Sequence, residues 1–302
     1  MVSEHTGLVL ERDGASYRVL ADGAELRAVL RGKAKRDMPK VVAGDRVHLE
    51  PEPQGGLWAI TGIETRRNVL ERREPHGRGA RPVVANVDRV FVVTAAKDPD
   101  PVPSIIDRML VLAEANDMPV ALVVNKTDLD PGTDLVARYQ RAGYEVLPVS
   151  VRTREGLAAI AAWLPGHATV VAGPSGAGKS SLLNALLPGL VLRTGDVSER
   201  TGRGKQTTVS ARMVPLPIGG WLVETPGFSE VGLWGLDPRG LAQCFPEMRA
   251  LLGQCRFPDC THRTEPGCAM TAAAQDGRVA PERLESYRLL LQEVTEEKKD
   301  WE

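Results

Sequence analysis

The eight residues from Gly173 to Ser180 constrain the fold of this chain more than any other segment. They read GPSGAGKS and match the pattern G-x-x-x-x-G-K-[ST]. The apolar run Ala168–Ala172 precedes them, and a stretch of helical character, Lys179–Leu187, follows. A strand that turns through glycines into a helix gathers backbone N–H groups and the positive helix end at one point. The segment therefore predicts a phosphate-binding loop in an α/β domain.

The residues of this loop have separate expected roles. Glycines let the backbone approach the phosphates, Lys179 reaches the β- and γ-phosphates, and the hydroxyl of Ser180 binds Mg²⁺. The alternative is a glycine-rich turn that holds no ligand. The expected nucleotide contacts come from Gly173, Ser175, Gly176, Ala177, Gly178, Lys179, Ser180 and Ser181.

The residues before this loop alternate between apolar runs and helical stretches. The runs are Asp88–Ala95, Val120–Val124 and Glu145–Val149, and the helical stretches are Ser104–Asn116, Leu135–Ala142 and Arg154–Trp163. Near-continuous apolar strands separated by helices predict a parallel sheet that is covered on both faces. After the loop, Ser210–Leu216 and Gly220–Glu224 are typical of a hairpin.

A base-reading motif follows the second of these strands. Asn125, Lys126, Thr127 and Asp128 form the sequence N-K-x-D. The Asp128 carboxylate can accept from the N1–H and 2-amino groups of guanine together, and a site built for that pair rejects adenine. Asn125 can address the O6/N7 edge, the Lys126 stem can cover the base, and Ser150 follows the next strand and can support the base. These residues predict guanine selectivity beside the phosphate loop, and they disfavour an ATPase.

The N-terminal part is rich in short apolar runs. They are Gly7–Leu10, Ser16–Leu20, Glu25–Leu30, Asp45–Glu50 and Leu57–Ile63, separated by turn signals such as Asp13-Gly14. This spacing predicts a small β-barrel, with an OB-fold as the candidate and a β-sandwich fragment as the alternative. The segment Glu64–Pro82, rich in Arg, Pro and Gly, reads as a linker.

A Cys/His cluster follows the predicted nucleotide domain. Three of the four cysteines of the chain, Cys255, Cys260 and Cys268, stand close to His262. Three thiolates and one imidazole suit tetrahedral Zn²⁺ in a closed structural site, because four protein ligands leave no open position for catalysis. Cys244 stands apart and is expected to be a small buried residue.

The net charge of −1 over 302 residues hides a basic N-terminal third. Basic side chains flank a predicted barrel loop, namely Arg27, Arg31, Lys33, Lys35, Arg36 and Lys40. OB-folds bind nucleic acid through one face and its loops, which makes this region a candidate RNA surface. A solvated basic face is the alternative. No signal-like or membrane-length apolar segment is present, so we expect a cytoplasmic protein without a membrane partner.

The order of the motifs carries a family resemblance. N-K-x-D with such a loop is similar to translation-factor-class GTPases, but here Asn125–Asp128 and Ser150 precede the phosphate loop. This order is that of a circularly permuted GTPase. With the N-terminal barrel and the Cys/His cluster, nearly the whole chain resembles the bacterial RsgA (YjeQ) family. The expected fold is a circularly permuted α/β P-loop GTPase domain with an N-terminal β-barrel (OB-fold) and a C-terminal zinc-binding domain. The expected domains are residues 1–70, 71–235 and 236–302.

The resemblance also implies the switch residues. Thr208, with Thr207 as the alternative, would close over Mg²⁺ and the γ-phosphate, and Glu224 with Gly227 would form the second switch. Lys179, Thr208 and Gly227 are the implied catalytic residues, and Ser180, Thr208 and Glu224 the implied Mg²⁺ site. Glu224 stands where the family usually has Asp, and Gln206 where it commonly has His.

The resemblance implies a GTPase of small-ribosomal-subunit biogenesis. It would bind GTP/GDP, Mg²⁺ and one Zn²⁺, and its partners would be the small (30S) ribosomal subunit and its rRNA, with no DNA partner and a monomeric state. Phe228, after Gly227, cannot position a water as glutamine does in Ras-like enzymes, so turnover would need the subunit. A GTP-gated RNA-binding module with negligible turnover is the alternative.

Overall fold

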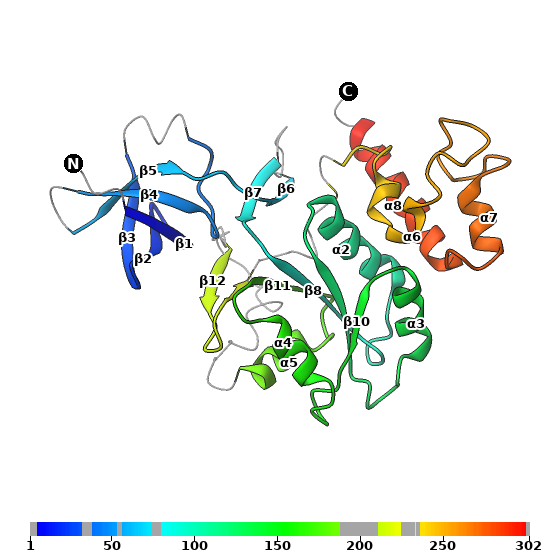
Figure 1. The fold of residues 1–302 in the computed structure, drawn as a ribbon, viewed down its shortest axis with the longest axis horizontal. Helices are drawn as coiled ribbons and strands as arrows, with labels where there is room; N and C mark the ends of the chain where they lie inside the picture. Colours follow the sequence, from blue (N-terminus) through cyan, green and yellow to red (C-terminus); the bar gives the residue numbers. More distant parts are fainter. Residues whose placement is uncertain are drawn as a thin grey trace, which may run out of the picture. The chain divides into compact units, whose positions relative to one another are not determined.

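The computed structural model describes residues 5–31, 38–52, 56–73, 80–187, 211–224, 233 and 236–299 (Figure 1). The described residues fall into two compact units. The first takes its residues from 1–88, 164–170 and 195–227, and the second from 89–163, 171–194 and 228–302.

The first unit contains the predicted N-terminal barrel. Its strands are β1 (His5–Asp13), β2 (Ser16–Ala21), β3 (Ala24–Leu30), β4 (Arg46–Pro51) and β5 (Trp58–Ile63). They pair in the order β1-β2-β3-β5-β4, and β4 pairs back with β1, which closes the barrel. Apolar side chains from alternate positions fill its centre, among them Val9, Val19, Leu49 and Ile60. The five-stranded barrel predicted from the sequence is confirmed.

The interpretation of Glu64–Pro82 as a linker is wrong. Within Glu64–Pro82 the chain forms β6 (Val69–Arg73), which pairs antiparallel with β7 (Ala80–Ala85). This hairpin contacts the barrel, because Ala43 bridges to Val84 and a Cβ atom at Gly44 would overlap the carbonyl of Ala85. Composition alone does not favour strands here, because the segment is rich in Pro and Gly, which are rare in strands.

One arginine of that segment, Arg66, stabilises the fold through a buried ion pair. Arg66 donates from Nε to Oδ1 of Asp45 at 2.7 Å and from Nη2 to Oδ2 at 2.9 Å. The Asp45 side chain is fully buried, and its Oδ2 also accepts from the backbone N–H of Val42 at 2.8 Å. This bidentate pair fixes the chain as it leaves the barrel.

The first unit also holds the predicted hairpin. β12 (Arg212–Pro215) pairs antiparallel with β13 (Trp221–Glu224), and β13 pairs parallel with β11 (Ala168–Ala172). β12 also meets β1, where Arg212 is opposite Glu11.

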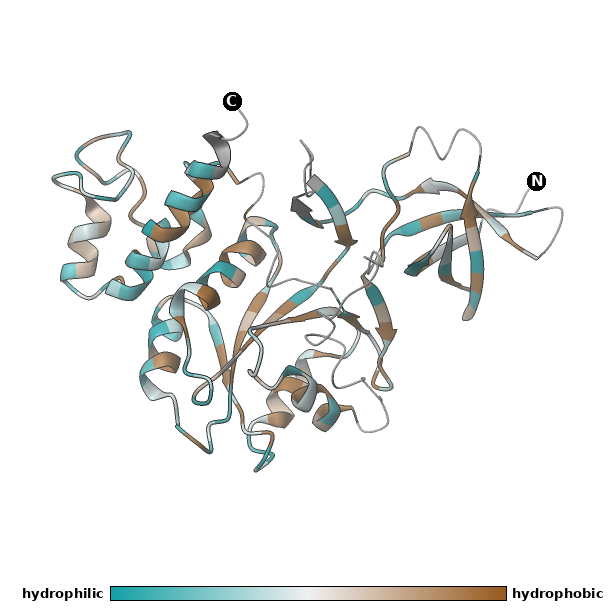
Figure 2. Ribbon diagram, turned by 180° about the vertical axis from the view of Figure 1, so that it is seen from behind, coloured by the Kyte–Doolittle hydropathy of each residue, from teal (hydrophilic) through white to brown (hydrophobic). Residues whose placement is uncertain are grey.

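The second unit is built on the predicted parallel sheet. β8 (Arg89–Ala95), β9 (Val120–Asn125) and β10 (Glu145–Pro148) pair in parallel, with β9 between the other two. Strands β8 and β9 are buried almost throughout, and Figure 2 shows hydrophobic residues running along the strands. The connecting helices are α2 (Pro103–Ala115), α3 (Thr133–Arg141) and α4 (Leu157–Trp163), and α5 (Lys179–Leu186) follows the glycine loop.

The C-terminal residues pack onto this sheet unit. They form the 3-10 turn η2 (Leu241–Cys244) and the helices α6 (Pro246–Arg249), α7 (Ala269–Gln275) and α8 (Pro281–Lys299). Helix α8 packs against α2 (Figure 1), where Arg108 Nη1 donates to Glu293 Oε1 at 2.6 Å. No helix among the residues described is long and apolar enough to cross a bilayer.

A buried arginine joins the C-terminal residues to the sheet unit. Arg283 of α8 donates from Nη1 to Asp107 of α2 and from Nε to Glu247 of α6, both at 2.7 Å. The hydroxyl of Tyr139 in α3 donates to the same Asp107 oxygen at 2.7 Å, and the ring of Phe245 lies 4.5 Å from the guanidinium. One cation therefore holds together four separate elements.

We predict that Arg283→Ala destabilises the protein by about 3–5 kcal/mol, because it leaves two buried carboxylates without their cation. Urea unfolding followed by circular dichroism measures the change. The matched control is Arg278→Ala, which removes an exposed arginine paired with Asp276 and should leave the midpoint almost unchanged. Equal midpoints for the two variants would contradict the prediction.

Candidate nucleotide-binding site and metal centre

The glycine loop has the strand–turn–helix form that the sequence predicts. β11 ends at Ala172, the loop follows, and Gly178 is the N-cap of α5 with φ of 87°. A Cβ atom at Gly173 would overlap the carbonyl of Val93 in β8. The loop is therefore seated directly on β8 with its glycines at positions where other residues do not fit.

Lys179 lies across this loop. Its Nζ donates to the carbonyl oxygens of Gly173 at 2.7 Å and Pro174 at 2.9 Å. Burial lowers the pKa of Lys179, since the charged form loses water. These two carbonyl oxygens accept the hydrogen bonds of the Lys179 ammonium group that phosphate oxygens would otherwise accept. Ser180 lies in the first turn of α5, and Ser175 and Gly176 are exposed at the loop tip.

Asn125 connects the base-reading motif to the phosphate loop. It ends β9 and is buried, and its Nδ2 donates to the carbonyl of Ala177 at 3.0 Å. Its Oδ1 accepts from the backbone N–H of Lys126 at 2.8 Å. A Cβ atom at Gly178 would overlap the Asn125 amide. Two segments predicted to serve one nucleotide are thus in direct contact.

Asp128 is held by two donors. Ser150 Oγ donates to Oδ1 at 2.5 Å, and Arg152 Nε donates to Oδ2 at 2.6 Å. These hydrogen bonds, first that of Ser150 and then that of Arg152, lower the pKa of Asp128, so the side chain is an ionised acceptor. The position of Ser150 after a strand marks it in the sequence, whereas nothing in the spacing of Arg152 distinguishes it from the other arginines.

The loop after β8 also reaches the site. Lys126 Nζ donates to the carbonyl oxygen of Asp98, and Pro99 lies beside Gly176, where an added Cβ would come within 3.1 Å of its Cδ. Residues 98 and 99 therefore border both the base-reading motif and the phosphate loop. Only the fold brings them there, and no local signal marks them.

The implied switch residues are only partly described. Glu224 is exposed at the end of β13. Thr208, Thr207, Gln206, Gly227 and Phe228 lie outside the described residues.

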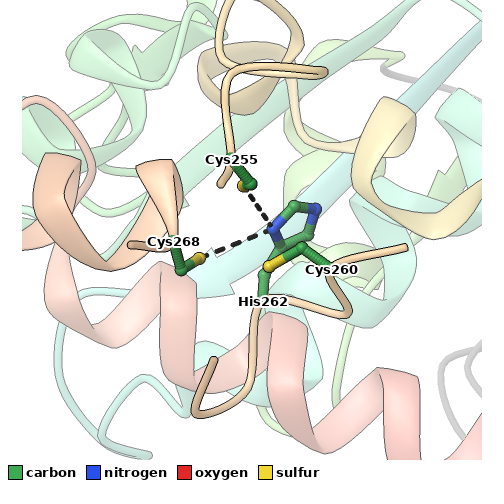
Figure 3. Close-up of side chains that lie close together, drawn as sticks. All are labelled: Cys255, Cys260, His262 and Cys268. Atoms are coloured by element: carbon green, nitrogen blue, oxygen red, sulfur yellow. Dashed lines mark hydrogen bonds between the residues drawn. The ribbon is translucent and has the colours of Figure 1, made fainter. Parts of the chain in front are cut away.

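The four predicted metal ligands come together in the segment between α6 and α7 (Figure 3). One ligand atom from each of Cys255, Cys260, His262 and Cys268 lies within 4.8 Å of every other. His262 Nδ1 is 3.4 Å from Cys255 Sγ and 3.6 Å from Cys268 Sγ. A tetrahedral zinc with ordinary bond lengths would separate nitrogen and sulfur by about 3.6 Å, so the cluster fits this ion.

The loop that carries these ligands is stabilised by its own polar groups. The Glu265 carboxylate accepts from the backbone N–H groups of Thr261 and Arg263, both at 2.8 Å. Burial opposes ionisation, yet the hydrogen bonds centred on Thr261 lower the pKa of Glu265 to about 2. From α8, the Tyr287 hydroxyl donates to the Thr261 carbonyl at 3.2 Å and Arg288 Nε to the His262 carbonyl at 3.1 Å. Helix α8 therefore orients the ligand loop.

Comparison with known proteins gives matches along nearly the whole chain. The RsgA GTPase family model matches residues 63–234. A protein of Gemmatimonas aurantiaca named small ribosomal subunit biogenesis GTPase RsgA is 46% identical, over 97% of this chain and 99% of its own length. A protein of Moorella thermoacetica with the same name is 40% identical, over 95% and 97%.

Two solved structures share the fold. The crystal structure of YjeQ from Thermotoga maritima matches with a TM-score of 0.79 and 32% identity, over 97% of this chain and 99% of that one. The structure of YloQ, described as a circularly permuted GTPase, matches with a TM-score of 0.75 and 27% identity, over 97% and 96%.

We predict that Gly178→Ala weakens GDP binding at least tenfold, because the new methyl group would displace the Asn125 amide. Fluorescence titration with a labelled GDP measures the affinity. The matched control is Gly277→Ala, since Gly277 has φ of 80° and open space around it. Both variants carry the backbone strain of alanine at positive φ, about 1–2 kcal/mol, but only the first carries the clash. If both variants bind GDP equally well, the close approach has no role in binding.

Proposed function

The chain belongs to the RsgA GTPase family, and from this membership we propose that it hydrolyses GTP to GDP and phosphate under stimulation by the small ribosomal subunit. The observation that supports this proposal best is the hydrogen bond from Asn125 to Ala177, which joins a guanine-reading motif to a phosphate loop. The relatives are named as GTPases of small-ribosomal-subunit biogenesis, and the matches cover 97% and 95% of this chain. We therefore assign it to a late step of subunit assembly.

The proposed nucleotide site uses the residues identified from the sequence. Asn125, Lys126, Asp128 and Ser150 hold the guanine, and Lys179 with the N–H groups of the loop holds the phosphates. Mg²⁺, which neutralises phosphate charge when bound, would be held by Ser180, Thr208 and Glu224. Glutamate at position 224 carries one more methylene than the aspartate usual in the family, so its carboxylate reaches further.

The partner is proposed to complete the hydrolytic site. Phe228 offers no polar atom to orient the attacking water, so the free chain would turn over slowly. Thr208 and Gly227 would close on the γ-phosphate in the subunit-bound state. The alternative function is a GTP-gated RNA-binding module with negligible turnover.

The barrel is the proposed rRNA-binding domain. Arg27 and Arg31 are exposed and pair with Asp13 and Glu52 at 3.2 and 2.9 Å. Ion pairs with so exposed an arginine contribute little to stability, so these arginines can exchange their carboxylates for phosphates. Arg66 is excluded from that role, because its guanidinium is committed to buried Asp45. Domain limits of 1–70, 71–235 and 236–302 are part of the proposal.

We predict that purified small ribosomal subunits raise the GTP hydrolysis rate of the full chain at least tenfold. Phosphate release is measured with and without subunits, and Lys179→Ala is the control that should abolish turnover in both cases. A fast rate that subunits leave unchanged would contradict the proposal. GTP-dependent subunit binding without any stimulated release would favour the RNA-binding module.

We also predict one Zn²⁺ per chain, held by Cys255, Cys260, His262 and Cys268. Elemental analysis measures the metal, and Cys260→Ser should lower its content while Cys244→Ser, which changes a buried cysteine outside the cluster, should not. Because the ion would serve structure, chelation should unfold the ligand loop and leave GDP affinity intact. A chain that is fully folded and metal-free after purification would refute a structural zinc.

A further inference from the structure

We propose that Arg152 is a positioning residue for guanine recognition, whose guanidinium fixes the second oxygen of Asp128 so that the carboxylate accepts from both donors of the base. This inference rests on the proposed function, since it assumes that the site holds a guanine nucleotide. Arg152 lies outside the N-K-x-D motif and has no role in it.

The geometry of Asp128 requires a second contact. The torsion that turns the plane of an aspartate carboxylate is broad and roughly two-fold, so one hydrogen bond leaves the plane free to swing. Ser150 Oγ holds Oδ1 at 2.5 Å and Arg152 Nε holds Oδ2 at 2.6 Å. Contacts to both oxygens fix the plane before a ligand arrives.

The two contacts leave the carboxylate able to bind guanine. An ionised carboxylate has about four lone-pair sites, of which Ser150 and Arg152 use one each. Two sites remain, one on each oxygen, which matches the two donors, N1–H and the 2-amino group, at the guanine edge. The Arg152 contact therefore leaves Oδ2 of Asp128 a lone pair with which to accept from the base.

The backbone that presents Arg152 is held tightly. The N–H of Ser150 donates to the carbonyl of Glu155 at 3.0 Å, and Ser150 Oγ accepts from the N–H of Thr153 at 3.1 Å. Gly156, with φ of 75°, lies so close to the carbonyl of Pro148 that an added Cβ would overlap it. A turn fixed on both sides of Arg152 keeps its guanidinium within reach of Asp128.

Global stability does not account for this contact. The Arg152 side chain is 71% exposed, and an ion pair with so exposed a partner contributes little to folding. Its effect is expected in binding, where a base that covers Asp128 excludes water and makes the orientation of the carboxylate decisive.

The test compares GDP with inosine diphosphate, which lacks the 2-amino group and so uses only one of the two carboxylate oxygens. Arg152→Ala should weaken GDP binding about tenfold and inosine diphosphate binding threefold or less, because only GDP needs both oxygens in place. The GDP-to-inosine-diphosphate affinity ratio should therefore fall at least threefold. Arg152→Lys, which keeps a donor and the charge, should restore part of that ratio.

The matched control is Arg154→Ala, which removes an exposed arginine of the same turn and should leave both affinities unchanged. Thermal unfolding of the variants checks that each is folded. If Arg152→Ala weakens both ligands equally, affects neither, or tightens GDP binding, the positioning role is wrong. Binding of ADP to the wild-type chain distinguishes failure of the Arg152 proposal from failure of the proposed nucleotide site. If the wild type binds GDP more tightly than ADP, the guanine-nucleotide site stands whatever Arg152 does. If it does not, both the site and the role of Arg152 are wrong.

Discussion

The hydrogen bond from the Asn125 amide to the Ala177 carbonyl is the contact on which the nucleotide site depends. The two residues are 52 positions apart, one at the end of β9 and the other in the glycine loop before α5. Gly178 permits the approach because it has no Cβ and sits at positive φ. The contact lies at the carboxyl end of β9, the edge where parallel α/β sheets bind ligands. For this reason the chain can present its base-reading motif before its phosphate loop without separating them in space.

A second anchor gives the C-terminal residues a fixed place within the same unit. Arg283 ties α8 to Asp107 of α2 and Glu247 of α6, and Tyr287 and Arg288 of the same helix hold the carbonyls of the metal-ligand loop. Helix α8 thus contacts both α2 and the loop that carries the Cys/His cluster, and it fixes the one relative to the other. The metal, when bound, would hold the ligand loop together beside α8, which is consistent with a structural rather than a catalytic role.

The sequence predicted the parts whose signals are local. The barrel strands, the parallel strands, the glycine loop and the four cluster residues all follow from periodicity or spacing. The features that the sequence does not predict depend on contacts between distant segments. The composition of Glu64–Pro82 predicts a linker where the β6–β7 hairpin forms, and it does not show that Arg66 pairs with buried Asp45. Arg152 and Pro99 have no local signal. Thr208 and Gly227 lie outside the described residues and stay predictions.

The central claim is that one site reads guanine and holds phosphate together. Titration calorimetry of the full chain with GDP and with ADP tests it most directly. The arrangement of Asn125 and Asp128 beside the phosphate loop predicts one GDP per chain and ADP binding at least about a hundredfold weaker, because adenine leaves the ionised Asp128 without its donors. Equal affinity for the two nucleotides, or no binding of either, would contradict the account.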